Sequence, residues 1–250
     1  VRGTGVVKGA FGVMYPPEDG LCEVMILART EPIPDTGRLV LHLHFTGSAG
    51  LTAETAPESE DLQTGLDDLT VLLATAGIAV EVGGYHDISG VEEDPGLVNL
   101  TGTIGAPNDF SRLLLLGQDE DRFALNLFFV NSIYKDDDFG PQGGVVLGIS
   151  AGVPGPAFVG PSYRSGVAIA TFDEAAGKGY FGSTMAHEVG HYLGLFHSTE
   201  QGSELHDTLS DTPEDDPSNL MFWAHSPDEQ LISDHQGIVM RSHPLVLAEE

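Results

Sequence analysis

Three histidines in this chain have the spacing of a metal site. His187 and His191 are four residues apart in the segment 187–197 (HEVGHYLGLFH), so on a helix both imidazoles lie on one face, one turn apart. Gly194 lets the chain leave that helix through a backbone conformation closed to most residues, which brings His197 round as a third ligand. Three neutral imidazoles leave one position of a tetrahedral zinc ion open for water, as in catalytic zinc sites.

Glu188 directly follows the first histidine and can reach a water at the metal without being a ligand itself. Zinc lowers the pKa of such a water, and the carboxylate can take its proton as a general base. The metal also polarises a peptide carbonyl and stabilises the oxyanion. The alternative is a helix with core or solvent-facing histidines, but five fixed positions and a glycine break favour metal-assisted amide hydrolysis.

The longer pattern of residues 187–197 is that of the metzincin clan of zinc peptidases, which this chain resembles. Members carry a methionine-containing turn beneath the zinc, and residues 219–223 (Asn-Leu-Met-Phe-Trp) place Met221 in such a turn. Together with Asp-Thr-Pro at 211–213 and a following helix that contains Gln230, this combination is similar to the pappalysin branch. The resemblance implies a zinc-dependent endopeptidase that acts on peptides or proteins.

The match covers about residues 181–241 and implies an α/β (α+β) zincin fold. This fold has a twisted mixed sheet, a backing helix, an active-site helix and a small irregular C-terminal lobe. A substrate would lie extended along an edge strand of the sheet, for which residues 144–150 are the candidate. Met221 would form a hydrophobic floor under the imidazoles without binding zinc.

Two positions depart from the family pattern. Relatives often have Tyr two residues after the turn Met, whereas this chain has Trp223, whose indole donates one hydrogen bond but cannot reproduce a phenol. Branch members also commonly carry disulfides, which this chain cannot form because Cys22 is its single cysteine. We expect Cys22 to be a buried small hydrophobe, although a thiolate that reaches the zinc as a latency switch is an alternative.

A loop downstream of the histidines is rich in carboxylates, which are typical calcium ligands. Its acidic residues are either a calcium site or an exposed acidic loop, because no complete ligand spacing is visible. The five are Asp207, Asp211, Glu214, Asp215 and Asp216. Two other functions therefore stay open beside the active peptidase. One is a catalytically weak zinc-binding homologue, suggested by Trp223, and the other is an acidic calcium-binding interaction module.

We expect residues 1–250 to form a single catalytic domain, with an N-terminal lobe at 1–197 and a C-terminal lobe at 198–250. Periodicity, caps and turn residues predict the elements of both lobes. The predicted strands are 21–28, 38–46, 78–85, 122–133, 145–149 and 166–171, and the predicted helices are 59–76, 109–117, 181–193 and 227–241. In the first of these helices, leucines at helical spacing predict a core-facing stripe, namely Leu62, Leu66, Leu69 and Leu73.

His42 and His44 alternate on the predicted strand 38–46 and so face the same side of the sheet. They could form a second metal pair, but a paired position on the surface or facing the cleft is favoured. Further histidines at positions 206, 225, 235 and 243 lack ligand spacing.

Composition limits the partners of the protein. The 250 residues include 38 acidic and 10 basic side chains, for a net charge of −28, which repels nucleic acid and anionic lipid. No apolar run is long enough to predict a membrane span. The chain begins at Val1 rather than Met, which suggests a trimmed, mature form, and we expect a secreted or extracellular protein.

Overall fold

The structure is a computed structural model with a mixed sheet at its centre. It describes residues 32–89, 95–101, 107–117, 122–135, 146–171, 180–202, 204–224 and 230–248. Cys22 and the predicted strand 21–28 lie outside these residues. The sheet order is β2 (Ile78–Asp87), β1 (Gly37–Phe45), β4 (Ala124–Val130), β7 (Val167–Ala170), β6 (Gly148–Ser150). The first four strands are parallel, and β6 runs antiparallel to β7 at the edge. The predicted α/β fold with a mixed sheet is therefore confirmed.

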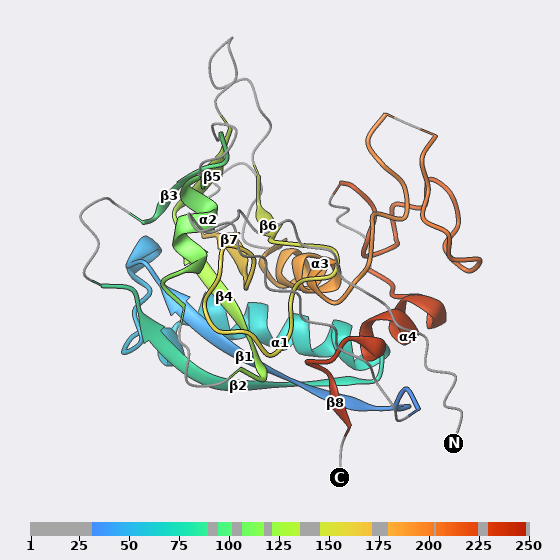
Figure 1. The fold of residues 1–250 in the computed structure, drawn as a ribbon, viewed down its shortest axis with the longest axis horizontal. Helices are drawn as coiled ribbons and strands as arrows, with labels where there is room; N and C mark the ends of the chain where they lie inside the picture. Colours follow the sequence, from blue (N-terminus) through green and yellow to red (C-terminus); the bar gives the residue numbers. More distant parts are fainter. Residues whose placement is uncertain are drawn as a thin grey trace, which may run out of the picture.

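Helices cover one face of this sheet and carry the larger core (Figure 1). Helix α1 (Glu60–Thr75) begins at Ser59, whose hydroxyl accepts the backbone N–H of Leu62, and ends before Gly77, where φ is +73°. Its predicted leucine stripe is buried, as expected for a backing helix. Helix α3 (Phe181–Tyr192) packs against α1 on the same side, in a shared core with apolar residues of β1 and β4.

The opposite face is covered by shorter elements. Helix α2 (Asp109–Leu114) packs there with a second apolar cluster that contains Phe128 and Val130 of β4. A small two-stranded sheet, β3 (Leu97–Asn99) with β5 (Ser132–Tyr134), lies beside it. The predicted strand 122–133 is thus divided, because the chain leaves the main sheet after Val130 and pairs again in β5. Sequence periodicity does not show such a change of partner.

The histidines of β1 are buried, so the predicted surface or cleft-facing position is wrong. Strand β1 is central, and both of its faces are covered. His44 is fully buried, stacks on His86 and Phe128 at ring-centroid distances of 5.1 Å and 4.7 Å, and is hydrogen-bonded through Nε2 to Asn126 Oδ1 at 2.7 Å. His42 also contacts the His86 ring. No metal-binding group among the described residues includes either histidine of β1.

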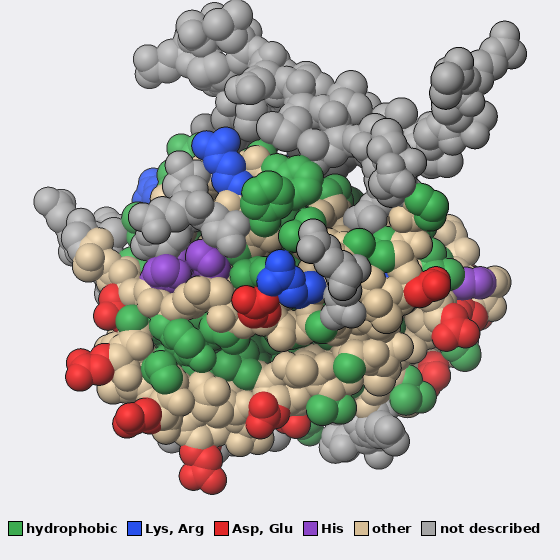
Figure 2. Space-filling view, turned by 90° about the horizontal axis from the view of Figure 1, so that it is seen from below, with side chains coloured by type: hydrophobic (Ala, Val, Ile, Leu, Met, Phe, Trp, Pro, Cys, Tyr) green, Lys and Arg blue, Asp and Glu red, His purple; other side chains and the backbone are tan. Residues whose placement is uncertain are grey.

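After α3 the chain is mostly irregular until α4 (Asp234–Ser242), and β8 (Leu247–Ala248) then pairs with β1. The final helix begins later than the predicted 227–241. Ser233 and Gln236 form a reciprocal capping box, which fixes the helix start at Asp234. Acidic side chains are dispersed over the face of the molecule shown in Figure 2, so the strong negative charge is spread rather than gathered there. None of the described helices could cross a bilayer.

Candidate metal centre and active site

Helix α3 and the turn that follows it position the three histidines. His187 and His191 lie one turn apart on α3, which ends at Tyr192. The turn is closed by backbone hydrogen bonds from Gly194 N to His191 O and from Leu195 N to Gly190 O, both 2.9 Å. Gly194 has φ of +112°, a conformation that L side chains rarely adopt, and this reversal sends the chain back toward the helix.

The three imidazoles converge on one point. His187 Nε2 and His197 Nε2 are 3.3 Å apart, and the ligand atoms of all three residues lie within 4.8 Å of one another. Among the described residues this is the only group of three or more metal-ligating side chains. Zinc binds imidazole nitrogen at about 2.0–2.1 Å, so two ligands of a tetrahedral ion are about 3.3 Å apart. The separation of the two Nε2 atoms therefore fits zinc.

Each imidazole is oriented by an acceptor at its other nitrogen. The Nδ1–H groups of His187 and His191 donate to the carbonyl oxygens of Leu220 (2.7 Å) and Leu195 (2.8 Å). His197 Nδ1 is 3.0 Å from a carboxylate oxygen of Glu200. Because these acceptors take the Nδ1 proton, every Nε2 presents its lone pair to the shared point. Burial lowers the pKa of His191 to about 4, which keeps this ring neutral at pH 7.

Glu188 is buried beside the histidines, at the edge of the sheet. Its carboxylate accepts a hydrogen bond from the backbone N–H of Ser150 in β6. The strand comes so close that a Cβ atom added at Gly148 would stand 2.5 Å from Glu188 Cγ. Burial raises the pKa of Glu188 to about 8, although the Ser150 hydrogen bond opposes this shift.

The predicted methionine turn lies under α3. Met221 is fully buried, and its sulfur is 2.7 Å from the position that a Cβ on Gly190 would take. This contact needs a glycine on the helix. Met221 thus packs against α3 at Gly190, between His187 and His191 along the helix, and it directly follows Leu220, the acceptor for His187.

A cleft runs between β6 and the methionine turn, and it contains the histidines and Glu188. Its other described lining residues are mostly apolar: Val146, Leu147, Gly148, Ile149, Ser150, Val153, Thr184, Leu220, Phe222, Trp223, Ala224 and Gln230. Strand β6 is the edge of the sheet, as predicted for residues 144–150. Glu188 is the only carboxylate among these lining residues, so the acidic character of the chain does not extend to the described walls of the cleft.

The five acidic residues of the downstream loop do not converge. Three of them organise the loop itself as hydrogen-bond acceptors: Asp207 from Thr212, Asp211 from Ser233, and Asp216 from Ser218. Glu214 is 3.5 Å from the imidazole of His206, and the backbone N–H of Asp215 donates to Thr199. No three carboxylates among the described residues form a metal-binding group.

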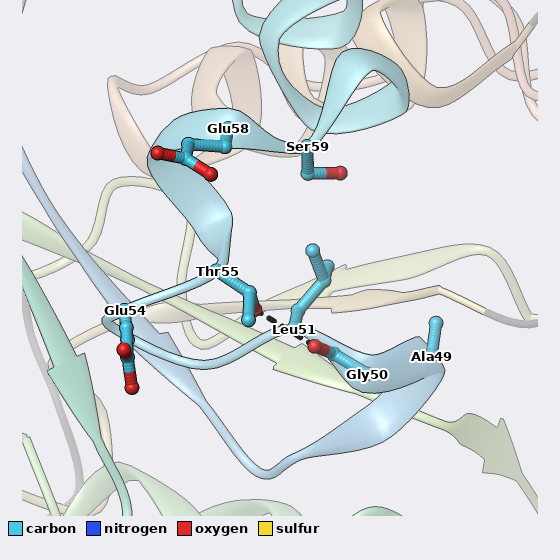
Figure 3. Close-up of a pocket in the computed structure, with 7 residues that line it drawn as sticks. All are labelled: Ala49, Gly50, Leu51, Glu54, Thr55, Glu58 and Ser59. Carbon is cyan, nitrogen blue, oxygen red and sulfur yellow. Dashed lines mark hydrogen bonds between the residues drawn. The ribbon is translucent and has the colours of Figure 1, made fainter.

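A second hollow lies in the loop that precedes α1, away from the histidines. It is lined by residues 49–51, 54–55 and 58–59 (Figure 3). Its two carboxylates, Glu54 and Glu58, are exposed and do not point toward one another, and the Thr55 hydroxyl donates to the Gly50 carbonyl. This hollow brings together no pair of groups that could do acid–base or metal chemistry.

Sequence reasoning missed the groups that orient the side chains of the candidate site. Glu200 was recognisable in principle, since a metal-binding imidazole often donates to a carboxylate and Glu200 is only three residues after His197. The carbonyl oxygens of Leu195 and Leu220 carry no sequence signal, because every residue has one. Gly148 gave no signal either, because its role depends on where a distant helix packs.

No protein-family model and no curated protein matches this sequence. The chain is similar to a solved structure, the crystal structure of metalloproteinase-II from Bacteroides fragilis, with 15% sequence identity and a TM-score of 0.48. The similarity covers 86% of this chain and 55% of the other, so the chain spans about half the length of that structure. Function is therefore argued from the geometry of the site.

Proposed function

We propose that this protein is a zinc-dependent endopeptidase of the metzincin type, in which His187, His191 and His197 hold the metal and Glu188 is the general base. One observation carries the proposal. Three imidazoles with fixed Nδ1 partners converge beside a buried carboxyl group, at the edge strand of a sheet. A structural zinc site usually has four protein ligands, whereas only three come together among the described residues.

The residues of the site have distinct tasks. Bound zinc would supply the Lewis acidity that makes a water molecule nucleophilic near neutral pH and polarises a peptide carbonyl. Glu188 accepts the proton of the attacking water and returns it to the leaving amine. Burial raises the pKa of Glu188 above the usual carboxyl range and so toward the operating pH, where general acid–base groups work best. Its burial also excludes bulk water from the proton it holds.

The substrate would bind as an extended peptide. Strand β6 forms the edge of the sheet and lines the cleft together with the preceding residues Val146 and Leu147. A peptide that adds to this edge places its backbone beside Glu188, because Ser150 of the same strand is hydrogen-bonded to that carboxylate. An endopeptidase needs this arrangement, since it holds both sides of the scissile bond.

Membership of the pappalysin branch is a further part of the proposal. It is supported by the Asn219-Leu220-Met221 turn and by Asp-Thr-Pro at 211–213. A catalytically weak homologue is the second candidate, because Trp223 lies in the cleft wall where relatives often have a tyrosine. An indole N–H can donate to an oxyanion, but it lacks the phenol's geometry.

The test is cleavage of a peptide library by zinc-loaded protein. Glu188→Ala should bind about one zinc per chain, as the wild type does, and should lose about 10²–10⁴-fold in kcat, the usual contribution of a general base. Glu54→Ala is the matched control, because it removes an exposed carboxylate in the remote hollow at 49–59 and should change nothing.

Two results would change the proposal. Unreduced cleavage by the Glu188→Ala protein would rule out Glu188 as the base. A wild-type protein that binds zinc and cleaves no peptide would favour the weak homologue or an interaction module.

A further inference from the structure

A reciprocal amide pair joins the methionine turn to α4. Asn219 Nδ2 donates to Gln236 Oε1 at 3.1 Å, and Gln236 Nε2 donates to Asn219 Oδ1 at 3.0 Å. Both side chains are buried, with 4% and 0% of their surfaces exposed. Two antiparallel hydrogen bonds between planar amides allow one relative orientation of the two side chains. The pair therefore fixes the position of the methionine turn relative to α4.

The pair is fixed by the backbone on each side. Asn219 Oδ1 also accepts the N–H of Met221 at 2.9 Å, and Gln236 Oε1 also accepts the N–H of Ser233 at 2.9 Å. A backbone N–H can only donate, so these contacts settle which amide atom is oxygen in both side chains. The four hydrogen bonds therefore form one consistent network in the core.

The residue between the two fixed points of the turn is Leu220, which accepts the Nδ1–H of His187 at 2.7 Å. Its own N–H donates to the Leu231 carbonyl at 2.8 Å. The Asn219 side chain accepts a hydrogen bond from the N–H of Met221, so the backbone is fixed on both sides of Leu220. The direction of the Leu220 carbonyl is set in this way. That carbonyl in turn sets the rotation of the His187 ring.

Helix α4 is itself anchored to the sheet lobe. Arg241 Nε donates to the Pro34 carbonyl at 2.9 Å, and its guanidinium also donates to the Ala76 carbonyl at the end of α1. Gly237 lies against Ala76, where an added Cβ would be in contact with the Ala76 backbone. Helix α4 is thus fixed to the sheet lobe, and Gln236 of this helix holds Asn219 in place.

We propose that Asn219 and Gln236 are positioning residues for the metal site: they fix the Leu220 carbonyl and through it the orientation of His187, and so they set the affinity for zinc. This proposal rests on the zinc site of the proposed function but not on peptide cleavage. A purely structural role for the pair would lower stability and leave the affinity of the folded protein for zinc unchanged.

Zinc affinity of the full chain, measured by competition with a chromogenic chelator, separates the two roles. Gln236→Met keeps the length of the side chain and removes both amide contacts. It should raise the dissociation constant for zinc about 10-fold, the lower end of the effect of losing an outer-shell partner, because the Leu220 carbonyl remains but is held less firmly. Asn126→Leu is the matched control, since it removes a buried amide that contacts His44 on the sheet face opposite α3. It should lower the melting temperature without changing zinc affinity.

A double-mutant cycle keeps the proposal testable if Gln236→Met folds poorly. Asn219→Ala, Gln236→Ala and the double variant should lose zinc affinity to about the same extent, because each breaks the same unit. Unchanged zinc affinity in folded Gln236 variants would overturn the proposal, and so would an equal loss in Asn126→Leu. A wild-type protein that binds zinc without cleaving peptides would count against the proposed function alone, since the affinity comparison does not use cleavage.

Discussion

At the scale of single residues, the three imidazoles differ in the partner at Nδ1. Two donate to backbone carbonyls, whereas His197 faces the carboxylate of Glu200. A carboxylate partner makes an imidazole a stronger donor to a metal than a neutral oxygen does. We therefore expect His197 to bind zinc more strongly than its partly exposed position alone would suggest.

Replacing Glu200 tests this expectation. Glu200→Gln keeps an oxygen acceptor and removes the charge, so zinc affinity should fall about 10-fold. The melting temperature of the zinc-free protein should not change, because a solvent-exposed side-chain contact of this kind contributes little to stability. Glu214→Gln is the control, since Glu214 is the carboxylate partner of His206, which is outside the triad. An equal loss of zinc affinity in both variants would point to overall charge rather than to the contact.

The convergence of the three histidines was predictable from sequence because their spacing directly encodes geometry. His187 and His191 share a helix face, and Gly194 marks the reversal that returns His197. The burial of His42 and His44 was not predictable in the same way. Alternation showed that both face one side of β1, but only the packing of β4 and His86 decides that this side is covered.

At the scale of elements, the decisive contact is between the edge strand β6 and helix α3. Glu188 lies between them. Its carboxylate accepts a hydrogen bond from the backbone N–H of Ser150, and its Cγ packs close to the backbone of Gly148. The strand can approach this closely only because residue 148 has no side chain. The position of the proposed base, Glu188, therefore depends on the close packing of β6 on α3 rather than on a further polar group.

An alanine at position 148 should displace this base. In Gly148→Ala the added Cβ would stand 2.5 Å from Glu188 Cγ, so the carboxylate or the strand must shift. We expect kcat to fall about 10²-fold, as for a displacement of roughly 1 Å at a catalytic group. Zinc content should stay at one per chain. Steady-state kinetics with metal analysis measures both, and a normal kcat would contradict the role of the close approach.

Gly117→Ala serves as the comparison for that variant. An added Cβ at Gly117 would be 3.3 Å from Phe128, on the sheet face opposite α3. We expect a modest loss of stability and no change in kcat, because this glycine is remote from the cleft.

Most elements follow from local sequence, and the exceptions have tertiary causes. The leucine stripe and Ser59 cap define α1, and the continuous apolar run of β4 marks a central strand. The end of β4 depends on a partner strand elsewhere in the chain. The start of α4 was recognisable in the Ser233-x-x-Gln236 pattern, but Pro227 and the acidic residues after it favoured an earlier start.

At the scale of the whole molecule, a buried histidine links stability to pH. Burial lowers the pKa of His44 to about 4. The hydrogen bond to Asn126 opposes this shift, whereas the neighbouring imidazoles of His86 and His42 act in the same direction as burial. In the unfolded chain this imidazole takes up a proton near pH 6.5. Its neutral form therefore stabilises the fold fully above pH 6.5, and the stabilisation is lost as the pH falls toward 4.

The size of this effect is about 3 kcal/mol between the two pH values. Urea unfolding from pH 4 to pH 7.5 should show a smaller pH dependence for His44→Phe than for the wild type. Phenylalanine can keep the stacking on Phe128 without a titrating nitrogen. The difference between the two profiles cancels contributions from other groups, such as His191. Parallel profiles would show that His44 does not control acid stability.

The amino-acid composition predicted little about how charge is distributed over the molecule, whereas the spacing of the histidines predicted the arrangement of the site. The net charge of −28 gave no indication that the described cleft walls contain a single carboxylate, because charge counts do not say where side chains lie. The division into lobes at 197/198, the extracellular location and a calcium requirement stay predictions. The acidic loop illustrates why, since its carboxylates are used by local hydroxyl and backbone donors.

Trp223 has a consequence of a different kind. It is the only tryptophan in the chain, and it stands in the cleft wall with 38% of its surface exposed. Ultraviolet light that only tryptophan absorbs therefore excites one indole, whose emission responds to its surroundings in the cleft wall. The protein carries its own optical probe, with which arrival of a ligand could be followed in real time without a dye.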